Sequence, residues 1–275
     1  MSRISARFDT LKTERRAGLI SFLTAGDPDM ASFEAIIAGL PASGADLIEI
    51  GMPFSDPMAD GPAIQAAGLR ALKAGTKLGH ILAAVARFRA RDPATPIVLM
   101  GYYNPIYHYG AERFAGEAAA AGVDGLIIVD LPPEESDELT RCTAPLGLDF
   151  IRLTTPTTDD HRLMTVLKGA SGFLYHTAIA GITGTRSAAA ADVAMVIARV
   201  KRHSDLPVAV GFGIRTPSQA AEIARFADAV VVGTALVETV AAHLTADGTA
   251  APGLAPALHA QMRALAEGVR GARAD

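Results

Sequence analysis

Residues 46–62 read Asp-Leu-Ile-Glu-Ile-Gly-Met-Pro-Phe-Ser-Asp-Pro-Met-Ala-Asp-Gly-Pro. The apolar run 47–51 predicts a strand with one carboxylate, Glu49, at its middle, and the loop that follows carries Asp56 and Asp60. An ionised side chain in a buried strand is costly unless it is paired or its pKa shifts. From the strand alone, Glu49 is either a structural residue, in an ion pair or on an edge strand, or a functional acid.

Apolar runs of the same kind recur along the chain, each closed by Gly, Pro, Asp or Thr and followed by an Ala-rich helical segment. Because the runs are continuous rather than alternating, they predict strands buried on both faces, as in a parallel sheet. The predicted strands are 18–24, 47–51, 96–101, 125–130, 149–154, 172–176, 208–211 and 229–233. The predicted helices between and after them are 31–41, 63–91 with a break near Gly75, 111–121, 134–144, 159–167, 189–203, 218–224 and 236–244.

Eight strand-then-helix units in about 250 residues predict a single (β/α)8 TIM barrel. An open, doubly wound sheet is the alternative. We expect one domain over residues 1–275, with an extra N-terminal helix within 1–14, a loop over 245–257 and a C-terminal flanking helix over 258–270.

The composition excludes several classes of function. A net charge of −4 without a basic block argues against nucleic-acid binding. No apolar run approaches the ~18 residues of a membrane span, and the N-terminus lacks the apolar segment of a signal peptide. The single cysteine, Cys142, and the absence of paired histidine spacings predict a cytoplasmic protein without disulfides or a metal site.

In a barrel of this kind, the active site lies at the C-terminal ends of the strands. Ile48 and Ile50 fit helix-facing positions, which sends Glu49 into the barrel mouth. We expect a mouth lined by Phe22, Met100, Leu126 and Leu153, in which burial raises the pKa of Glu49. A raised pKa suits a carboxyl group that both donates and accepts protons near neutrality.

Two glycine-containing segments, 210–217 and 232–235, follow the last two predicted strands. Loops at these positions often hold a phosphate with backbone N–H groups and a helix N-terminus. Gly211, Gly213 and Gly233 would allow close backbone approach, while Thr234 would cap the next helix. The segment 178–187, with two glycines and one arginine, predicts a mobile lid, and an ordinary exposed loop is the alternative.

Seven motifs along residues 22–238 resemble the family of tryptophan synthase α subunits. They are LTAGDP (23–28), EIGMPFSDPMADGP (49–62), MGYYNP (100–105), DLPPEE (130–135), TTPTTDD (154–160), GITG (181–184) and GFGI (211–214). The resemblance implies retro-aldol cleavage of indole-3-glycerol phosphate to indole and glyceraldehyde 3-phosphate, a lyase step of tryptophan biosynthesis, with no cofactor in this chain.

The resemblance also implies a role for each site residue. Glu49 would protonate the indole C3 and take the proton of the side-chain hydroxyl, while Asp60 would face the indole N–H and balance the cation. Thr183 would close the lid towards Asp60. The implied substrate contacts are Phe22, Met100, Tyr102, Leu126, Ile127, Leu153, Tyr175 and Thr183. The implied phosphate contacts are Gly184, Gly213, Gly233 and Thr234.

A partner is implied by the loop that follows Glu49. The resemblance predicts a β subunit that carries pyridoxal phosphate, receives indole and forms an α2β2 heterotetramer with this chain. The expected interface residues are Pro53, Phe54, Asp56, Pro57 and Asn104, with Phe54 exposed at the tip of the turn. The alternative for Phe54 is that its ring folds back onto the barrel.

Three residues depart from the pattern of the family. Ala178 lacks a hydroxyl that the family usually has, Thr234 replaces the usual Ser, and His176 is unusual and interpreted as a packed, helix-facing residue. Two other functions stay open at this point. The chain could be a stand-alone lyase that releases free indole, or a catalytically weak barrel that acts as an allosteric or structural partner.

Overall fold

The computed structural model describes residues 2–178, 190–211 and 213–273. Its strands are all parallel and form a sheet in the order β5-β4-β3-β2-β1-β9-β8-β7-β6. The two ends of this sheet, β5 and β6, are separated only by Ile151, so the sheet curls into a barrel with one seam. The strands are β1 Gly18–Thr24, β2 Leu47–Gly51, β3 Ile97–Gly101, β4 Gly125–Ile128, β5 Asp149–Phe150, β6 Arg152–Thr154, β7 Leu174–Thr177, β8 Val208–Gly211 and β9 Ala229–Val232.

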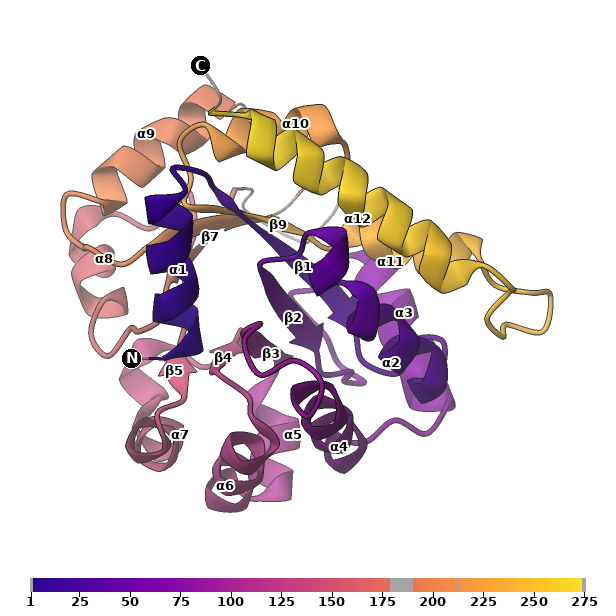
Figure 1. The fold of residues 1–275 in the computed structure, drawn as a ribbon. Helices are drawn as coiled ribbons and strands as arrows, with labels where there is room; N and C mark the ends of the chain where they lie inside the picture. The colour runs from indigo at the N-terminus through magenta and orange to yellow at the C-terminus, as the bar shows by residue number, and fades with distance from the viewer. Residues whose placement is uncertain (1, 179–189, 212, 274–275) are drawn as a thin grey trace.

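The TIM-barrel prediction is confirmed, with helices around the outside of the sheet (Figure 1). One predicted strand, 149–154, is split in two at Ile151. The helices are α1 Arg3–Thr13, α2 Met30–Gly39, α3 Pro62–Lys73, α4 Leu78–Arg89, α5 Tyr103–Tyr109, α6 Ala111–Ala121, α7 Asp137–Thr143, α8 Asp160–Val166, α9 Ala190–Val200, α10 Pro217–Ala224, α11 Thr234–Ala242 and α12 Leu254–Gly271. Three short 3-10 turns accompany them, η1 Pro41–Ser43, η2 Pro133–Glu135 and η3 Ala144–Leu146.

Two helix predictions need correction. Helix α5 was not predicted; its first N–H, that of Tyr103, donates to the carboxylate of Asp130 at 2.8 Å, which holds the start of the helix beside the end of β4. Helix α12 begins at Leu254 instead of residue 258, because Leu254 is itself buried in the core against the barrel. The expected loop is therefore shorter than 245–257.

The core has an inner layer inside the barrel and an outer layer between the sheet and the helices. Side chains alternate between the two layers along each strand, as the two-residue period of a strand requires. In β2, Leu47 belongs to the inner layer, whereas Ile48 and Ile50 belong to the outer one. This alternation leaves Glu49 on the inner side.

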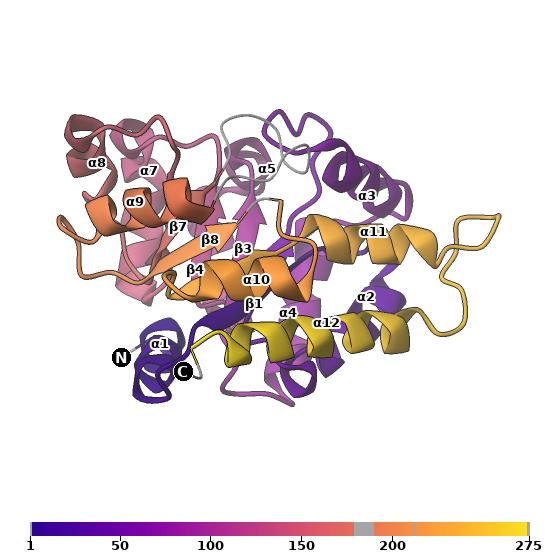
Figure 2. The same cartoon turned by 90° about the horizontal axis from the view of Figure 1, so that it is seen from above.

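The two terminal helices close the barrel. Helix α1 fills its N-terminal end, because Ile4, Phe8 and Leu11 join the inner layer and the Phe8 ring lies 5.7 Å from that of Phe173. Figure 2 shows α1 and α3 at opposite ends of the molecule. Helix α12 packs along α10, α11, α2 and β1 (Figure 1). Both contacts favour the predicted single domain. None of the helices that the structure describes is long and apolar enough to cross a bilayer.

Candidate active site

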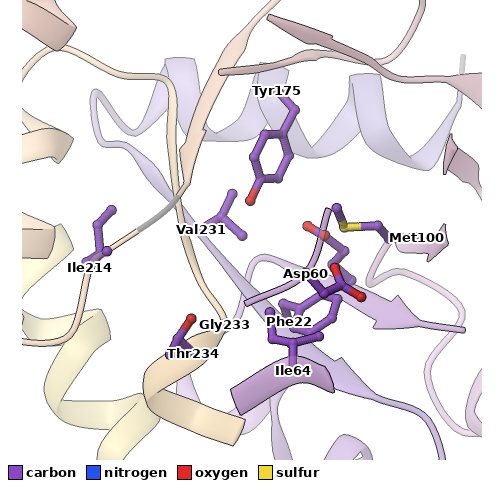
Figure 3. Close-up of a pocket in the computed structure, with 11 residues that line it drawn as sticks. Phe22, Asp60, Ile64, Met100, Tyr175, Ile214, Val231, Gly233 and Thr234 are labelled. Carbon is purple, nitrogen blue, oxygen red and sulfur yellow. The ribbon is translucent and has the colours of Figure 1, made fainter. Parts of the chain in front are cut away.

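A cavity opens at the C-terminal end of the barrel (Figure 3). It is bounded by β1, β2, β3, β7 and β9, by the start of α3, and by the segments that follow β8 and β9. Its lining residues are Phe22, Glu49, Asp60, Ile64, Met100, Tyr175, Gly213, Ile214, Val231, Gly233 and Thr234. The position is the one that the barrel topology predicts for an active site.

Glu49 lies at the base of this cavity. Its side chain is buried, at 1 % exposure, and among the described residues neither carboxylate oxygen has a hydrogen-bond partner. Burial, and secondly the charge of Asp60, raises the pKa of Glu49 to about 8. The structure confirms that Glu49 points into the barrel, and it holds this carboxyl group protonated at neutral pH.

Asp60 reaches the same cavity from the loop just before α3 (Figure 3). Burial raises its pKa to about 6, and a hydrogen bond with the hydroxyl of Tyr102 opposes that rise. The Tyr102 hydroxyl also accepts a hydrogen bond from the N–H of Ala59 at 3.0 Å, so it fixes this end of the loop. Two acids with pKa values on either side of neutrality can hold opposite protonation states together.

The ring of Phe22 forms one wall of the cavity, next to Ile64 and Met100 (Figure 3). Two glycines leave room for this ring. A Cβ atom at Gly51 would lie 2.6 Å from the ring, and one at Gly233 would lie 3.1 Å from it. The wall is apolar and flat, as a planar aromatic substrate requires.

Tyr175 projects its hydroxyl into the cavity from β7 (Figure 3). Burial, and secondly the charge of Glu49, raises its pKa well above the usual value near 10, so the group stays a neutral phenol. A Cβ atom at Gly211 would lie 2.0 Å from the Tyr175 hydroxyl oxygen. Gly211, predicted to approach a phosphate, instead makes room for Tyr175.

The far end of the cavity is formed by Gly213, Ile214, Gly233 and Thr234. Helix α11 begins at Thr234, and the carbonyl of Gly233 accepts hydrogen bonds from the N–H groups of Leu236 and Val237. The first N–H groups of a helix have no partner within it and carry its positive partial charge. This end of the cavity is therefore suited to an anion.

Three predicted indole contacts lie elsewhere. Leu126 is in the outer layer, between the sheet and the helices, so its predicted position in the mouth is wrong. Ile127 and Leu153 face the barrel interior but are absent from the lining of the cavity. Thr183 and Gly184 lie outside the described residues. Conversely, Ile64, Val231 and Ile214 line the cavity without having been predicted to do so.

The structure differs in part from the prediction for the partner surface. Phe54 is half-buried, with its ring 5.4 Å from that of Tyr102, so the exposed ring predicted at the tip was wrong and the folded-back alternative was right. The exposed apolar side chain of this loop is Met58, at 73 % exposure. Asp56 and Asn104 are exposed, and Pro53 and Pro57 are half-buried.

His176 is buried beside Thr154, whose hydroxyl lies 3.1 Å from the ring Nδ1. Burial, and secondly the charge of Arg199, lowers the pKa of this histidine to about 4, so the ring is neutral. It lies on the same side of β7 as Leu174, an outer-layer residue, which confirms the packed, helix-facing interpretation. Among the described residues, no three His, Cys, Asp or Glu side chains are grouped as metal ligands.

The site is thus a (β/α)8 barrel with two buried acids in the cavity at its C-terminal end, an arrangement suited to acid–base chemistry. Comparison with known proteins narrows the class. Residues 8–267 match the family model of the tryptophan synthase alpha chain. The chain is similar, at 38 % identity and a TM-score of 0.88, to tryptophan synthase subunit alpha from Legionella pneumophila, with 98 % of each chain covered.

The same identity, TM-score and coverage relate it to a chain in a structure of Mycobacterium tuberculosis tryptophan synthase. The chain therefore belongs to the tryptophan synthase alpha chain family. It is a lyase of tryptophan biosynthesis that cleaves indole-3-glycerol phosphate to indole and glyceraldehyde 3-phosphate.

Proposed function

We propose that Glu49 is both the general acid and the general base of this cleavage, and that Asp60 is its counter-charge. The observation that carries the proposal is the protonated, buried carboxyl group of Glu49 in the same cavity as a second acid of lower pKa. An acid with a pKa near the working pH can release a proton in one step and recover it in another.

The steps follow from these two protonation states. Glu49 donates its proton to C3 of the indole ring, which creates a positive charge shared with the ring nitrogen. The ionised Asp60 stabilises that charge through the ring N–H in a water-poor site. The Glu49 carboxylate then removes the proton of the hydroxyl on the adjacent side-chain carbon. The carbon–carbon bond breaks, its electrons return to the ring, and indole and the aldehyde separate.

The rest of the cavity orients the substrate in this proposal. Phe22 and Met100 pack on the indole, and the neutral hydroxyl of Tyr175 binds the glycerol chain. Gly213, Gly233 and Thr234 hold the phosphate at the start of α11, where N–H groups favour an anion. This chemistry uses protons alone, so we propose that the chain needs no cofactor of its own.

We also propose that the chain works with a β subunit in an α2β2 complex, in which the β subunit carries pyridoxal phosphate and receives indole. The supporting surface lies on the rim of the mouth. Met58, at 73 % exposure, and Tyr107, at 62 %, join the exposed Asp56 and Asn104 there. Large exposed apolar side chains next to polar ones are typical of an interaction site.

The test is indole release from indole-3-glycerol phosphate by the wild-type chain and by Glu49→Gln, each with and without the β subunit. We expect Glu49→Gln to lose at least a thousandfold in turnover in both settings while its circular dichroism spectrum stays native. Asp60→Asn should also lose turnover, and Arg141→Met, an exposed change on α7, should not. Near-normal turnover by Glu49→Gln would refute the assignment. A rate that the β subunit does not raise would favour a stand-alone lyase.

A further inference from the structure

One end of the active-site cavity, called here the phosphate end, is built from two separate segments of the chain. The first segment, residues 213–216, lies between β8 and α10 and contributes Gly213 and Ile214 to the lining. The second is Gly233 with the start of α11, which contributes Thr234. Figure 3 shows Ile214 on one segment and Thr234 on the other. The distance between the two segments therefore sets the width of the phosphate end.

In the described part of the chain, strand pairing stops before it reaches these segments. Strands β8 and β9 pair through Ala209–Ala229 and Val210–Val230, and both segments begin after these pairs. Contacts outside the strand ladder are therefore needed to hold the two segments at a fixed distance.

Arg215 provides such a contact. Its two terminal nitrogens each donate a hydrogen bond to the carboxylate of Glu238 on α11, and the distance from Nη2 to Oε1 is 2.9 Å. The backbone N–H of Arg215 donates to the side-chain oxygen of Gln219 on α10, also at 2.9 Å. Arg215 is thus bound to α10 through its backbone and to α11 through its side chain.

The ion pair lies next to residues that line the cavity. Arg215 directly follows Ile214 in the chain. Glu238 is four residues after Thr234 in α11, so both side chains are on the same face of the helix, one turn apart. A guanidinium and a carboxylate joined by two parallel hydrogen bonds have a fixed relative orientation, because both groups are planar.

We propose that the Arg215–Glu238 pair is a clamp that holds the two segments at the spacing a phosphate group requires. This inference rests on the proposed function, in which the phosphate end binds the phosphate of the substrate. Both residues are then positioning residues, because they act through Gly213, Ile214 and Thr234. The side chains are 41 % and 44 % exposed, so the pair contributes little to the stability of the fold.

Inhibition of the cleavage by each product tests the clamp. Glyceraldehyde 3-phosphate reports on the phosphate end, and indole reports on the aromatic wall. Arg215→Lys keeps the charge but loses the two-point contact, and Glu238→Gln removes the charged acceptor. Each variant should raise the inhibition constant of glyceraldehyde 3-phosphate by about fivefold or more. The inhibition constant of indole and the midpoint of urea unfolding should stay at the wild-type values.

The charge of Arg215 alone would give a different result. In that case Arg215→Lys would behave as wild type, and Glu238→Gln would bind glyceraldehyde 3-phosphate more tightly because a negative charge is lost. Either result would overturn the clamp. Arg87→Lys is the matched control, since Arg87 forms an exposed two-point pair with Glu34 between α4 and α2. It should leave both inhibition constants unchanged.

Gly213→Ala separates a failure of the clamp from a failure of the proposed phosphate site, because it adds a methyl group to the phosphate end itself. If Gly213→Ala weakens inhibition by glyceraldehyde 3-phosphate while the Arg215 and Glu238 variants do not, the clamp is wrong and the site stands. If none of the three variants changes that inhibition, the phosphate binds elsewhere and both proposals are wrong.

Discussion

Gly211 leaves the space that the Tyr175 hydroxyl fills: a Cβ atom at Gly211 would lie 2.0 Å from the Tyr175 hydroxyl oxygen. The two residues lie on neighbouring strands, β8 and β7, and Tyr175 is paired with Ala209 in the register between them. The position of this phenol in the active-site cavity therefore depends on the absence of a side chain on the next strand.

Gly211→Ala should move the Tyr175 ring and destabilise the fold by about 1–3 kcal/mol, the usual cost of overpacking. Cleavage should slow by more than the loss of stability accounts for, since the Tyr175 hydroxyl would be displaced from the active-site cavity. Urea unfolding and steady-state turnover measure the two effects. Combining Gly211→Ala with Tyr175→Phe should give less than additive losses, and strict additivity would contradict the proposed contact.

Stability should fall as pH rises because of Glu49. Its pKa is raised from about 4.5 to about 8 in the fold, so the native state keeps the proton over a range in which the unfolded chain has lost it. The contribution of the protonated group is complete below about pH 4.5 and is lost as pH rises to about 8. Glu49→Gln should flatten this slope in urea titrations at several pH values. An unchanged slope would show that the carboxyl group is not buried as described.

Turnover should depend on pH with a maximum between about 6 and about 8. Asp60 must be ionised to balance the cation, and its pKa is raised to about 6. Glu49 must be protonated to act as an acid, and its pKa is raised to about 8. A kcat/KM profile from pH 5 to pH 9 shows both limbs. In Asp60→Asn, the acid limb should disappear along with most of the rate.

Arg70 supports the loop after β1 from helix α3. It forms two hydrogen bonds to the buried carboxylate of Asp27, at 2.7 and 2.8 Å. Arg70→Met leaves that charge buried and unpaired, which should cost about 3–5 kcal/mol of unfolding free energy. The matched control is Arg87→Met, which breaks an exposed pair with Glu34 and should cost less than about 1 kcal/mol. Equal losses in both variants would contradict this difference.

Met58 and Tyr107 should contribute to partner binding without affecting the chemistry. Met58→Ala should weaken binding of the β subunit by about tenfold, a typical loss for an important interface side chain. The rate of the isolated chain should not change. Met195→Ala, at an equally exposed methionine on α9 (66 %), is the control and should leave binding intact. Calorimetry with the β subunit measures the loss of binding, and turnover without the β subunit measures any change in the chemistry.

The sequence alone predicted the barrel and the inward direction of the Glu49 side chain. A single polar residue within an apolar strand distinguishes the inner face of that strand from the face that packs against the helices. It was insufficient for Leu126. The run Gly-Leu-Ile-Ile of β4 contains no polar residue, so its two faces look alike until the register is known. The split of the strand 149–154 at Ile151 was also beyond the sequence, because it shows only in the pairing, where β5 pairs with β4 and β6 pairs with β7.

Contacts between distant segments were also beyond the sequence. The ring of Phe54 turns onto Tyr102, and nothing near Phe54 in the chain indicates that the other ring is there. Helix α5 has only seven residues and a proline at its third position, so its pattern is that of a loop. The motif resemblance did predict Asp60 beside Glu49, although neither spacing nor periodicity would have done so.

Helix α12 is the last helix of the chain, and it packs on α2 and β1 as well as on α10 and α11. Of these elements, β1 and α2 are among the first that the ribosome synthesises. During synthesis, these early elements emerge with an apolar flank that has no cover until the ribosome has produced α12. The barrel is thus completed late, and a chain that stops before Leu254 would present that flank to chaperones and to other nascent chains.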